Sequence, residues 1–291
     1  NLKGSGYIVG INGVPLMRDM SGQWFETEMP VNHWMKSGKN RLDLVVVAEE
    51  WGEEIPQTAK HKVELRVKNA GEWDSYKVAD LIYSAKLREA GDPLALSEAT
   101  GRRNSLKEFQ GDSKGDVKIG IPEIKEIDKN VFLVTRTIDI PSNIPEWAFF
   151  KSDAIPDVNS MTDEEFDEFE RNLLKKYQKI YRALETGNIE EVIPMFRERN
   201  AELEKAFYLE PGVMEEKIRK SLINAANEAD AELLELGPDY VMFETYENGR
   251  LTHLIRSDGH PAIVQGFKKA MGSRSYDLVF RYKDGDWILT R

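Results

Sequence analysis

The chain contains 291 residues, of which 41% are hydrophobic and 31% charged, and its formal net charge at pH 7 is −11. This length suits two globular domains, each large enough to bury a core of its own. The excess of acidic residues excludes the basic stripe of a nucleic-acid-binding protein and disfavours adhesion to anionic lipid. It favours a basic partner or a neutral small ligand.

The sequence has no cysteine, which excludes disulfides, thiolate nucleophiles and cysteine metal sites. The longest apolar runs, such as Leu44–Ala48, are too short to span a bilayer, so we expect no membrane insertion. The lack of cysteine favours a periplasmic or otherwise extracytoplasmic protein. The first residue, Asn1, is not methionine, which indicates either a trimmed chain or a mature protein after removal of a signal peptide. A cytoplasmic location is the alternative.

Residues 1–152 are predicted to form a β-sandwich. Val63–Val67 alternates apolar and charged residues, which is typical of a strand with one buried face. Short runs rich in Val, Ile, Tyr and Phe recur between turn residues. The predicted strands are Tyr7–Ile11, Trp24–Val31, Leu42–Ala48, Lys62–Lys68, Lys77–Ser84, Val117–Ile127 and Val131–Ile140. Residues 88–116 are rich in turn formers and charges, and are predicted to form an irregular, partly helical excursion.

A linker, Lys151–Ser160, precedes a change to helical periodicity, so a second domain is predicted over residues 160–291. Thr162 and Glu165 form a capping box, which predicts a helix from there to Gly187 as its C-cap.

Two further helices and an antiparallel sheet are predicted after Gly187. The helices run from about Asn188 to Phe207, with Pro194 in the first turns, and from about Gly212 to Leu236. Asn-Gly and Asp-Gly turns predict two hairpins in the remainder. The predicted strands are Tyr240–Tyr246, Leu251–Arg256, Ala262–Phe267, Ser275–Tyr282 and Trp287–Thr290.

Two stretches of the C-terminal half carry a family resemblance. They are YRALETGNIEEVIPMF, Tyr181–Phe196, and YDLVFRYKDGDWILTR, Tyr276–Arg291. Both resemble the NTF2-like superfamily (SnoaL-like, cystatin-like cone). The resemblance implies an α+β cone with a curved antiparallel sheet. This chain departs from many members in placing three consecutive helices before the sheet. The superfamily includes enzymes, binding modules and assembly domains, so the resemblance selects no activity.

The first forty residues resemble galactose-binding-like β-sandwich domains. The matching pieces are Ile11–Leu16, with its Asn-Gly pair, and Met35–Leu42, with a lysine-x-glycine-x-asparagine-x-leucine arrangement. The resemblance implies a scaffold and does not imply a sugar site. Asn12-Gly13, and Gly38 with Asn40, are predicted to supply positive φ angles at turns.

Three tryptophans are candidate binding residues. Trp34 is either a stacking platform for a sugar ring or a plug at one end of the sandwich. Trp51 and Trp73 lie in acidic, turn-like segments between predicted strands, where burial is harder. They are either exposed anchors for a protein partner, which would then be basic, or covers for a sheet edge.

The histidine pattern predicts no metal site. None of His33, His61, His253 and His260 is four residues from another, and no HExxH motif is present. His253 is the fourth candidate binding residue. It shares a strand face with Leu251 and Ile255, and is either a general base inside the cone or a core histidine bonded to backbone.

The sequence predicts a non-catalytic binding protein of the bacterial envelope, inhibitor- or immunity-like, with a protein partner. It carries no recognisable catalytic set, nucleotide motif or EF-hand loop, so no cofactor is expected. The alternatives are a small-molecule-binding or enzymatic NTF2-like domain and carbohydrate binding through the sandwich. Polar residues converging inside the cone would favour the enzyme or ligand binder, and an apolar, filled cone would favour the protein-binding hypothesis. These patterns do not determine the oligomeric state.

Overall fold

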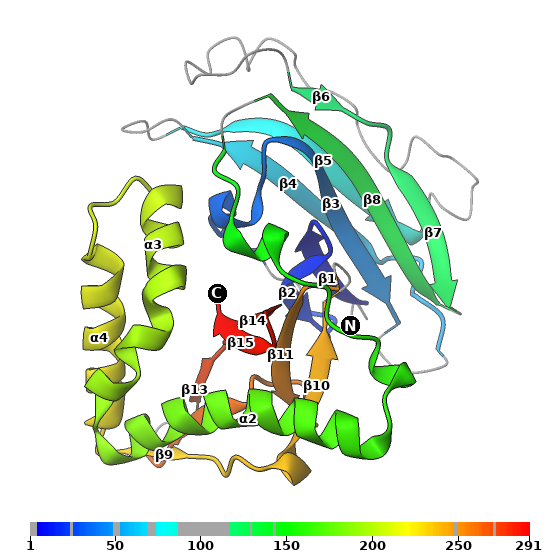
Figure 1. Ribbon diagram of the computed structural model, residues 1–291. Coiled ribbons are helices and arrows are strands. Elements are labelled where there is room, and N and C mark those ends of the chain that lie inside the picture. Colours follow the sequence, from blue (N-terminus) through cyan, green and yellow to red (C-terminus); the bar gives the residue numbers. More distant parts are fainter. Residues whose placement is uncertain are drawn as a thin grey trace. The chain divides into compact units, whose positions relative to one another are not determined.

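The computed structural model describes residues 5–23, 26–48, 53–68, 74–86, 117–128, 130–141, 144–246, 249–269 and 272–291 (Figure 1). It has a mixed, sheet-rich fold with mostly antiparallel sheets. The chain divides into two compact units, Asn1–Glu146 and Trp147–Arg291, which are described separately here. The predicted excursion at 88–116 lies outside the described residues.

The described residues of the first unit form a six-stranded and a two-stranded sheet, and every pairing in them is antiparallel. The larger sheet has the order β2-β1-β3-β8, with β6 and β7 sharing the outer side of β8. β4 pairs with β5 in the smaller sheet. The strands are β1 (Gly6–Ile11), β2 (Val14–Asp19), β3 (Gly38–Val47), β4 (Lys60–Val67), β5 (Tyr76–Ser84), β6 (Lys118–Ile119), β7 (Glu123–Asp128) and β8 (Val131–Ile140).

The core of the first unit follows from period-two alternation. Leu44 and Val46 of β3 are fully buried, as is Val134 of β8, which lies opposite Leu44. Leu81 and Tyr83 of β5 are also fully buried. A strand with alternate apolar side chains presents them all on one face, so each sheet has one face to bury.

Asn12 and Asn40 fix the turn region around the 3₁₀ turn η1 (Asn32–Trp34). Asn12 and Gly13 have φ angles of 56° and 76°, as predicted for this hairpin turn. Gly38 has a φ of 78°, but Asn40 lies inside β3 with an ordinary backbone, so its predicted positive φ is wrong. The Asn40 side chain organises the loop instead, since it accepts from the Lys36 amide at 2.9 Å and donates to the Lys36 carbonyl at 2.7 Å.

The second unit combines three α-helices with two small antiparallel sheets. One sheet has the order β10-β11-β14-β15 and the other β13-β12-β9, and a bridge from Ile255 to Pro261 connects β11 to the start of β12. The α-helices are α2 (Asp163–Thr186), α3 (Arg197–Ala206) and α4 (Val213–Ala226). The strands are β9 (Ala231–Leu233), β10 (Val241–Thr245), β11 (Leu251–Arg256), β12 (Ile263–Phe267), β13 (Ser273–Tyr276), β14 (Phe280–Lys283) and β15 (Asp286–Leu289). The 3₁₀ turns are η4 (Ala148–Lys151), η5 (Val158–Ser160), η6 (Ile189–Glu191), η7 (Ile193–Phe196) and η8 (Pro238–Tyr240).

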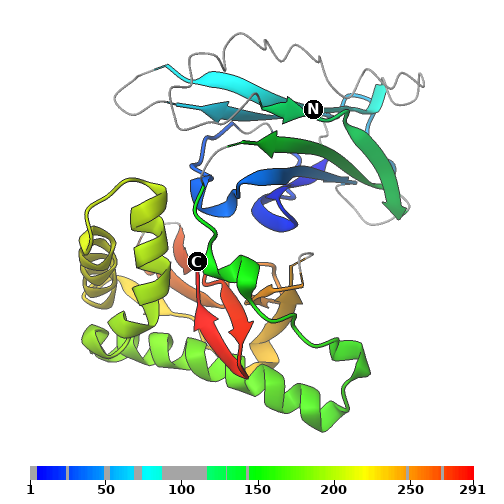
Figure 2. The ribbon, with the colours of Figure 1, turned by 45° about the horizontal axis from the view of Figure 1, so that its top comes forward.

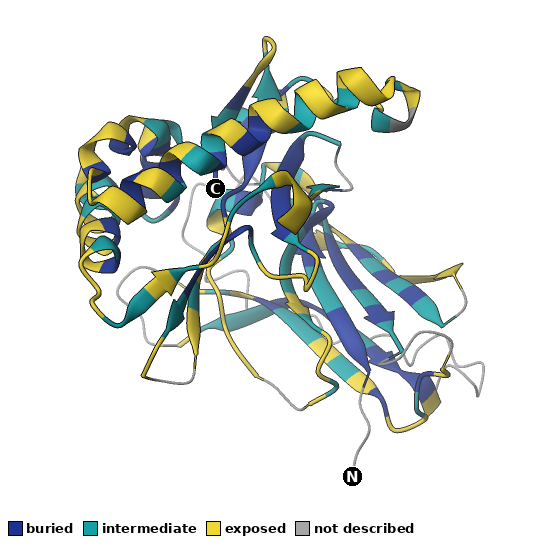
Figure 3. Cartoon of the chain, turned by 90° about the horizontal axis from the view of Figure 1, so that it is seen from below, coloured by how far each residue is buried: buried dark blue, intermediate teal, exposed yellow. Residues whose placement is uncertain are grey.

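The bounds of α2 confirm the prediction from its capping signals. The Thr162 side chain accepts from the Glu165 amide, and the Glu165 carboxylate accepts from the Thr162 amide. Gly187 ends the helix with a φ of 75°. One stripe of α2 is buried and the opposite side is exposed (Figure 3). The buried stripe packs beside the β14–β15 hairpin (Figure 2).

The space between α2 and the sheets is filled by apolar side chains. Tyr177, Phe280, Leu254 and Ile263 are at most 1% exposed. Trp287 closes one end, with ring centroids 4.9 Å from Phe169 and 4.8 Å from Tyr282.

Three predicted strands differ from the structure. The predicted strand Val117–Ile127 is divided into β6 and β7, which pair separately with β8. Residues 26–30, within the predicted strand Trp24–Val31, are all exposed and not extended in a sheet, so they have no buried face to stabilise pairing. β2 was not predicted because Pro15 cannot donate to a ladder; it is tolerated here on an edge strand beside a bulge. The predicted strand Ser275–Tyr282 is two strands of different sheets, β13 and β14.

Two predicted helices are shorter than expected. The segment from Asn188 to Phe196 forms the 3₁₀ turns η6 and η7, since Pro194 lacks the amide that an α-helix needs. The third helix ends at Ala226. Leu233, at helical spacing from Ala229, instead lies on β9 and pairs with Gln265.

Candidate functional site

His253 lies in the centre of the four-stranded sheet, on the face opposite α2. It is on β11, directly across from Glu244 of β10. Its neighbour Leu254 belongs to the apolar cluster that packs against α2. Adjacent residues of a strand point to opposite faces, so the His253 side chain points away from the helix side. His253 therefore does not face the apolar interior between α2 and the sheets.

Both ring nitrogens of His253 contact carboxylates. Nε2 lies 2.5 Å from Oε2 of Glu244, and Nδ1 lies 3.2 Å from Oδ1 of Asp277. The hydroxyl of Tyr246 lies 3.2 Å from the same Nδ1. The His253 ring is nearly buried, whereas the Asp277 side chain is 63% exposed. The cluster thus extends from the sheet interior to solvent.

This environment stabilises the charged imidazolium. Burial alone would lower the pKa of His253, but hydrogen bonds to Asp277 and Glu244 and the charges of both carboxylates raise it above its ordinary value. An imidazolium with both nitrogens donating has no lone pair to accept a proton. The arrangement therefore suits an ion cluster that joins β10, β11 and the β13–β14 connection, and does not suit a general base.

Trp34 is 9% exposed and its ring lies 5.1 Å from that of His33. Its carbonyl oxygen accepts from the Asn12 side chain at 2.9 Å. This is the position of a plug that supports the turn. A stacking platform for a sugar ring needs an exposed ring face, which the structure does not show for Trp34.

Trp51 and Trp73 lie outside the described residues, so their candidate role stays a prediction. Three of the acidic residues near them, Glu53, Glu54 and Asp74, are exposed.

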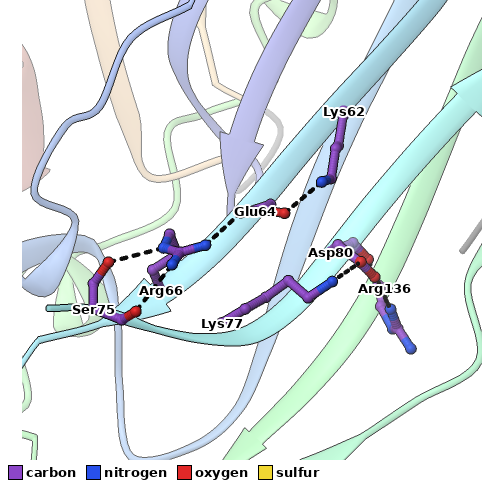
Figure 4. Close-up of polar contacts among 7 residues, drawn as sticks. All are labelled: Lys62, Glu64, Arg66, Ser75, Lys77, Asp80 and Arg136. Carbon is purple, nitrogen blue, oxygen red and sulfur yellow. Dashed lines mark hydrogen bonds and ion pairs between the residues drawn. The ribbon is translucent and has the colours of Figure 1, made fainter. Parts of the chain in front are cut away.

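Sequence reasoning missed a buried ion pair in the first unit. Arg136 of β8 donates to Oδ1 of Asp80 at 2.9 Å and to the Asp80 carbonyl at 2.8 Å, and both side chains are almost fully buried (Figure 4). Lys77 completes the cluster at 2.9 Å from Asp80. The pair connects the two sheets because β5 and β8 belong to different ones. An aspartate flanked by Ala79 and Leu81 in an apolar run was the available signal.

Tyr208, which sequence reasoning also missed, is displayed at the tip between α3 and α4. Its side chain is 89% exposed and its φ is 55°. It follows the C-cap residue Phe207, with Leu209 N bonded to Glu204 O at 2.9 Å and Tyr208 N to Lys205 O at 3.5 Å. This is a Schellman motif, in which the position of Tyr208 is usually glycine.

The buried carboxylate of Glu204 fixes this tip. Its Oε1 accepts from the amides of Gly212 at 2.9 Å and Met214 at 2.8 Å, at the start of α4. A carboxylate at a helix N-terminus is favoured by the helix dipole as well as by these bonds. The segment from Tyr208 to Gly212 is therefore held at both ends.

Within the described ranges, no group of three or more His, Cys, Asp or Glu is placed to hold a metal ion. Among the helices described, none is both long enough and apolar enough to cross a membrane. Comparisons with family models, curated proteins and solved structures gave no match.

Proposed function

We propose that this chain is a non-catalytic binding protein whose partner is another protein. The observation that carries the proposal is Tyr208, an exposed aromatic side chain on a hydrogen-bonded backbone whose conformation favours glycine. Buried aromatic anchors dominate the binding energy of many interfaces, and preorganised anchors lose little entropy on binding.

Exposure of a single aromatic residue is ordinary, so the backbone of Tyr208 is the decisive feature. A left-handed conformation costs a bulky residue about 1–2 kcal/mol relative to the right-handed one. Glycine would avoid that cost and would also remove an apolar ring from water. The Tyr208 ring is too exposed to contribute to the core, and a contact with a partner accounts for its presence.

Two features weigh against the enzymatic alternative. The interior between α2 and the sheets is filled by apolar side chains. A filled, apolar interior favours protein binding over an enzyme or a small-ligand binder. The titratable candidate on the other face, His253, has both nitrogens engaged by carboxylates. Carbohydrate binding through Trp34 has less support because that ring is buried.

We also propose a known architecture for each unit. The two sheets of the first unit fit a β-sandwich of the galactose-binding-like kind. The helices of the second unit, followed by strands that end in a tryptophan-bearing hairpin, fit an NTF2-like cone. An extracytoplasmic, inhibitor- or immunity-like role, with a basic partner, is consistent with the absence of cysteine and the net charge of −11.

The test is a pull-down from the source organism with mass spectrometry, followed by quantitative binding of the captured protein. Tyr208→Ser should weaken binding at least about tenfold, because loss of a central anchor costs more than about 1.4 kcal/mol. Ile121→Ser is the matched control, since Ile121 is 86% exposed without being held in this way. Equal affinity of the wild type and Tyr208→Ser for every captured protein would refute the proposal.

A further inference from the structure

A second site is indicated at the start of α3, where Arg199 and Asn200 lie side by side. Arg199 is half-buried and Asn200 is 3% exposed. Nη1 of Arg199 donates to Oδ1 of Asn200 at 3.1 Å. This is the only hydrogen bond of the Arg199 side chain to the described residues, and no carboxylate among them lies within ion-pair distance of it.

The other two arginines of this region are already neutralised. Arg281 donates to both oxygens of Glu198, at 2.7 Å and 2.6 Å. Arg291 donates to Oε2 of Glu202 at 2.6 Å. The other oxygen of Glu202 accepts from the Ala148 amide at 2.5 Å, so this carboxylate is fully used.

Arg281 and Arg291 each pair with a carboxylate, whereas Arg199 has none within ion-pair distance among the described residues. Arg199 is the group left without an anion. Burial, and then the nearby charge of Arg291, lower the pKa of Arg199 to about 10. A half-buried charge without a counterion is less favourable than a paired one, so a bound anion would stabilise Arg199.

Asn200 supplies a second donor at the same place. Its Nδ2 is buried and has no hydrogen-bond partner among the described residues. If the Asn200 amide were flipped, Nδ2 would face Nη1 of Arg199, and both groups are donors. The contact with Arg199 therefore determines which way the Asn200 amide points. Buried donors are almost always satisfied, which points to a missing acceptor. Because Oδ1 contacts Nη1, the Asn200 amide and the Arg199 guanidinium lie next to each other.

We propose that Arg199 and Asn200 form a binding site for the carboxylate group of a small organic acid. A planar carboxylate has two oxygens, one for the guanidinium fork and one for the amide. The site is independent of the protein-binding proposal, because it lies on other residues and takes another class of ligand.

The test uses the full chain in a buffer free of carboxylate and phosphate, with acetate replacing chloride at constant ionic strength. The side-chain amide of Asn200 and the Nε–H of Arg199 should shift saturably in ¹H–¹⁵N spectra, and the thermal midpoint should rise. Arg199→Gln should raise the half-saturation concentration about tenfold or more, because a charge-assisted bond is lost. Arg197→Gln is the matched control, since Arg197 is exposed on the same helix and loses the same charge.

Several outcomes would overturn this site. They are no saturable shift of the Asn200 amide, equal binding by wild type and Arg199→Gln, or an equal response to chloride, which would mean an adventitious ion only. Tighter binding of inorganic phosphate than of acetate would overturn the assignment to a carboxylate. If Arg199→Gln does not fold, Arg199→Lys keeps the charge and removes the planar fork, and it should still weaken acetate binding. Unchanged affinity in Arg199→Lys would count against the site.

Discussion

The hydroxyl group of Tyr177 on α2 donates to the carbonyl oxygen of Leu278 at 2.5 Å. The hydroxyl oxygen of Tyr177 in turn accepts from the Leu254 amide at 3.0 Å. β11 and β14 pair only at Leu251 and Thr252, and they separate beyond that point. Tyr177 therefore satisfies two backbone groups that the diverging strands leave without a ladder partner. The Tyr177 side chain is itself fully buried.

Replacement of Tyr177 by phenylalanine should destabilise the protein by about 1–3 kcal/mol, because a buried donor and a buried acceptor lose their partner. Urea denaturation of the variant measures the loss. Tyr181→Phe on the same helix is the control, since Tyr181 is only partly buried, and its free energy of unfolding should change by less than about 0.5 kcal/mol. Equal losses in both variants would show that the bridge contributes nothing particular.

The sequence predicted elements whose signals are local. The capping box at Thr162 and Gly187 gave the ends of α2, and the alternation in Val131–Ile140 gave β8. The 284–285 turn has φ angles of 50° and 81°, as its Asp-Gly pair predicts. Elements that depend on distant partners were not predicted. β9 exists because β12 pairs with it, and β2 accepts Pro15 because it lies at a sheet edge.

The candidate sites were likewise predicted where the signal is local and missed where it depends on distant residues. The alternation of β11 correctly placed His253 on one face with Leu251 and Ile255, but only the packing of α2 decides which face is the interior. The partners Glu244 and Asp277 come from the neighbouring strand and from a connection 24 residues away. Tyr208 was missed because its positive φ arises where α3 ends, and the sequence offers no glycine there to mark it.

The His253 cluster should make stability depend on pH in a defined direction. The pKa of His253 is raised in the folded state, so the cluster stabilises fully below the unfolded pKa of about 6.5 and loses this contribution as pH rises through the folded pKa. His253→Gln should therefore cost the most near pH 5, about 2 kcal/mol, and progressively less above pH 7. Chemical denaturation of wild type and variant across this range measures the difference.

His260→Gln is the control for this prediction, because His260 is exposed in the turn after β11. Its effect on the free energy of unfolding should be small at every pH. A cost of His253→Gln that grows with increasing pH would contradict the ion cluster and indicate a neutral histidine.

The buried pair of Asp80 and Arg136 should be costly to break from one side. Asp80→Asn should destabilise by about 3–5 kcal/mol, since it leaves the Arg136 guanidinium buried without its counterion. Replacing both residues, as Asp80→Leu with Arg136→Met, should cost less than the single change, because no charge is then left buried.

Glu64→Gln is the control for this prediction. It breaks the more exposed contacts to Lys62 and Arg66 on the same sheet (Figure 4), and should cost less than about 1 kcal/mol. A double-mutant cycle by urea denaturation separates these cases, and a loss for Asp80→Asn no larger than that for Glu64→Gln would contradict the prediction.

Trp51 and Trp73 keep their sequence-based prediction as partner-binding residues. If they are exposed anchors, Trp51→Ala and Trp73→Ala should leave the thermal midpoint unchanged and weaken partner binding by about 2 kcal/mol or more. If they cover a sheet edge, the midpoint falls and binding is unchanged. Both quantities should be measured on both variants, and a loss of stability alone would exclude these residues from the interface.

Tyr208→Gly should stabilise the protein while it weakens partner binding. Glycine takes the left-handed conformation without the steric cost, and this gain exceeds the extra entropy that glycine loses on folding, for a net gain of about 0.5–1 kcal/mol. Tyr208→Ala keeps the strain and removes the ring, so it should weaken binding without raising stability. Comparison of the two variants by urea denaturation separates backbone strain from side-chain contacts. A lower free energy of unfolding for Tyr208→Gly than for the wild type would mean that the ring packs on the protein itself, and a partner would then no longer be needed to explain it.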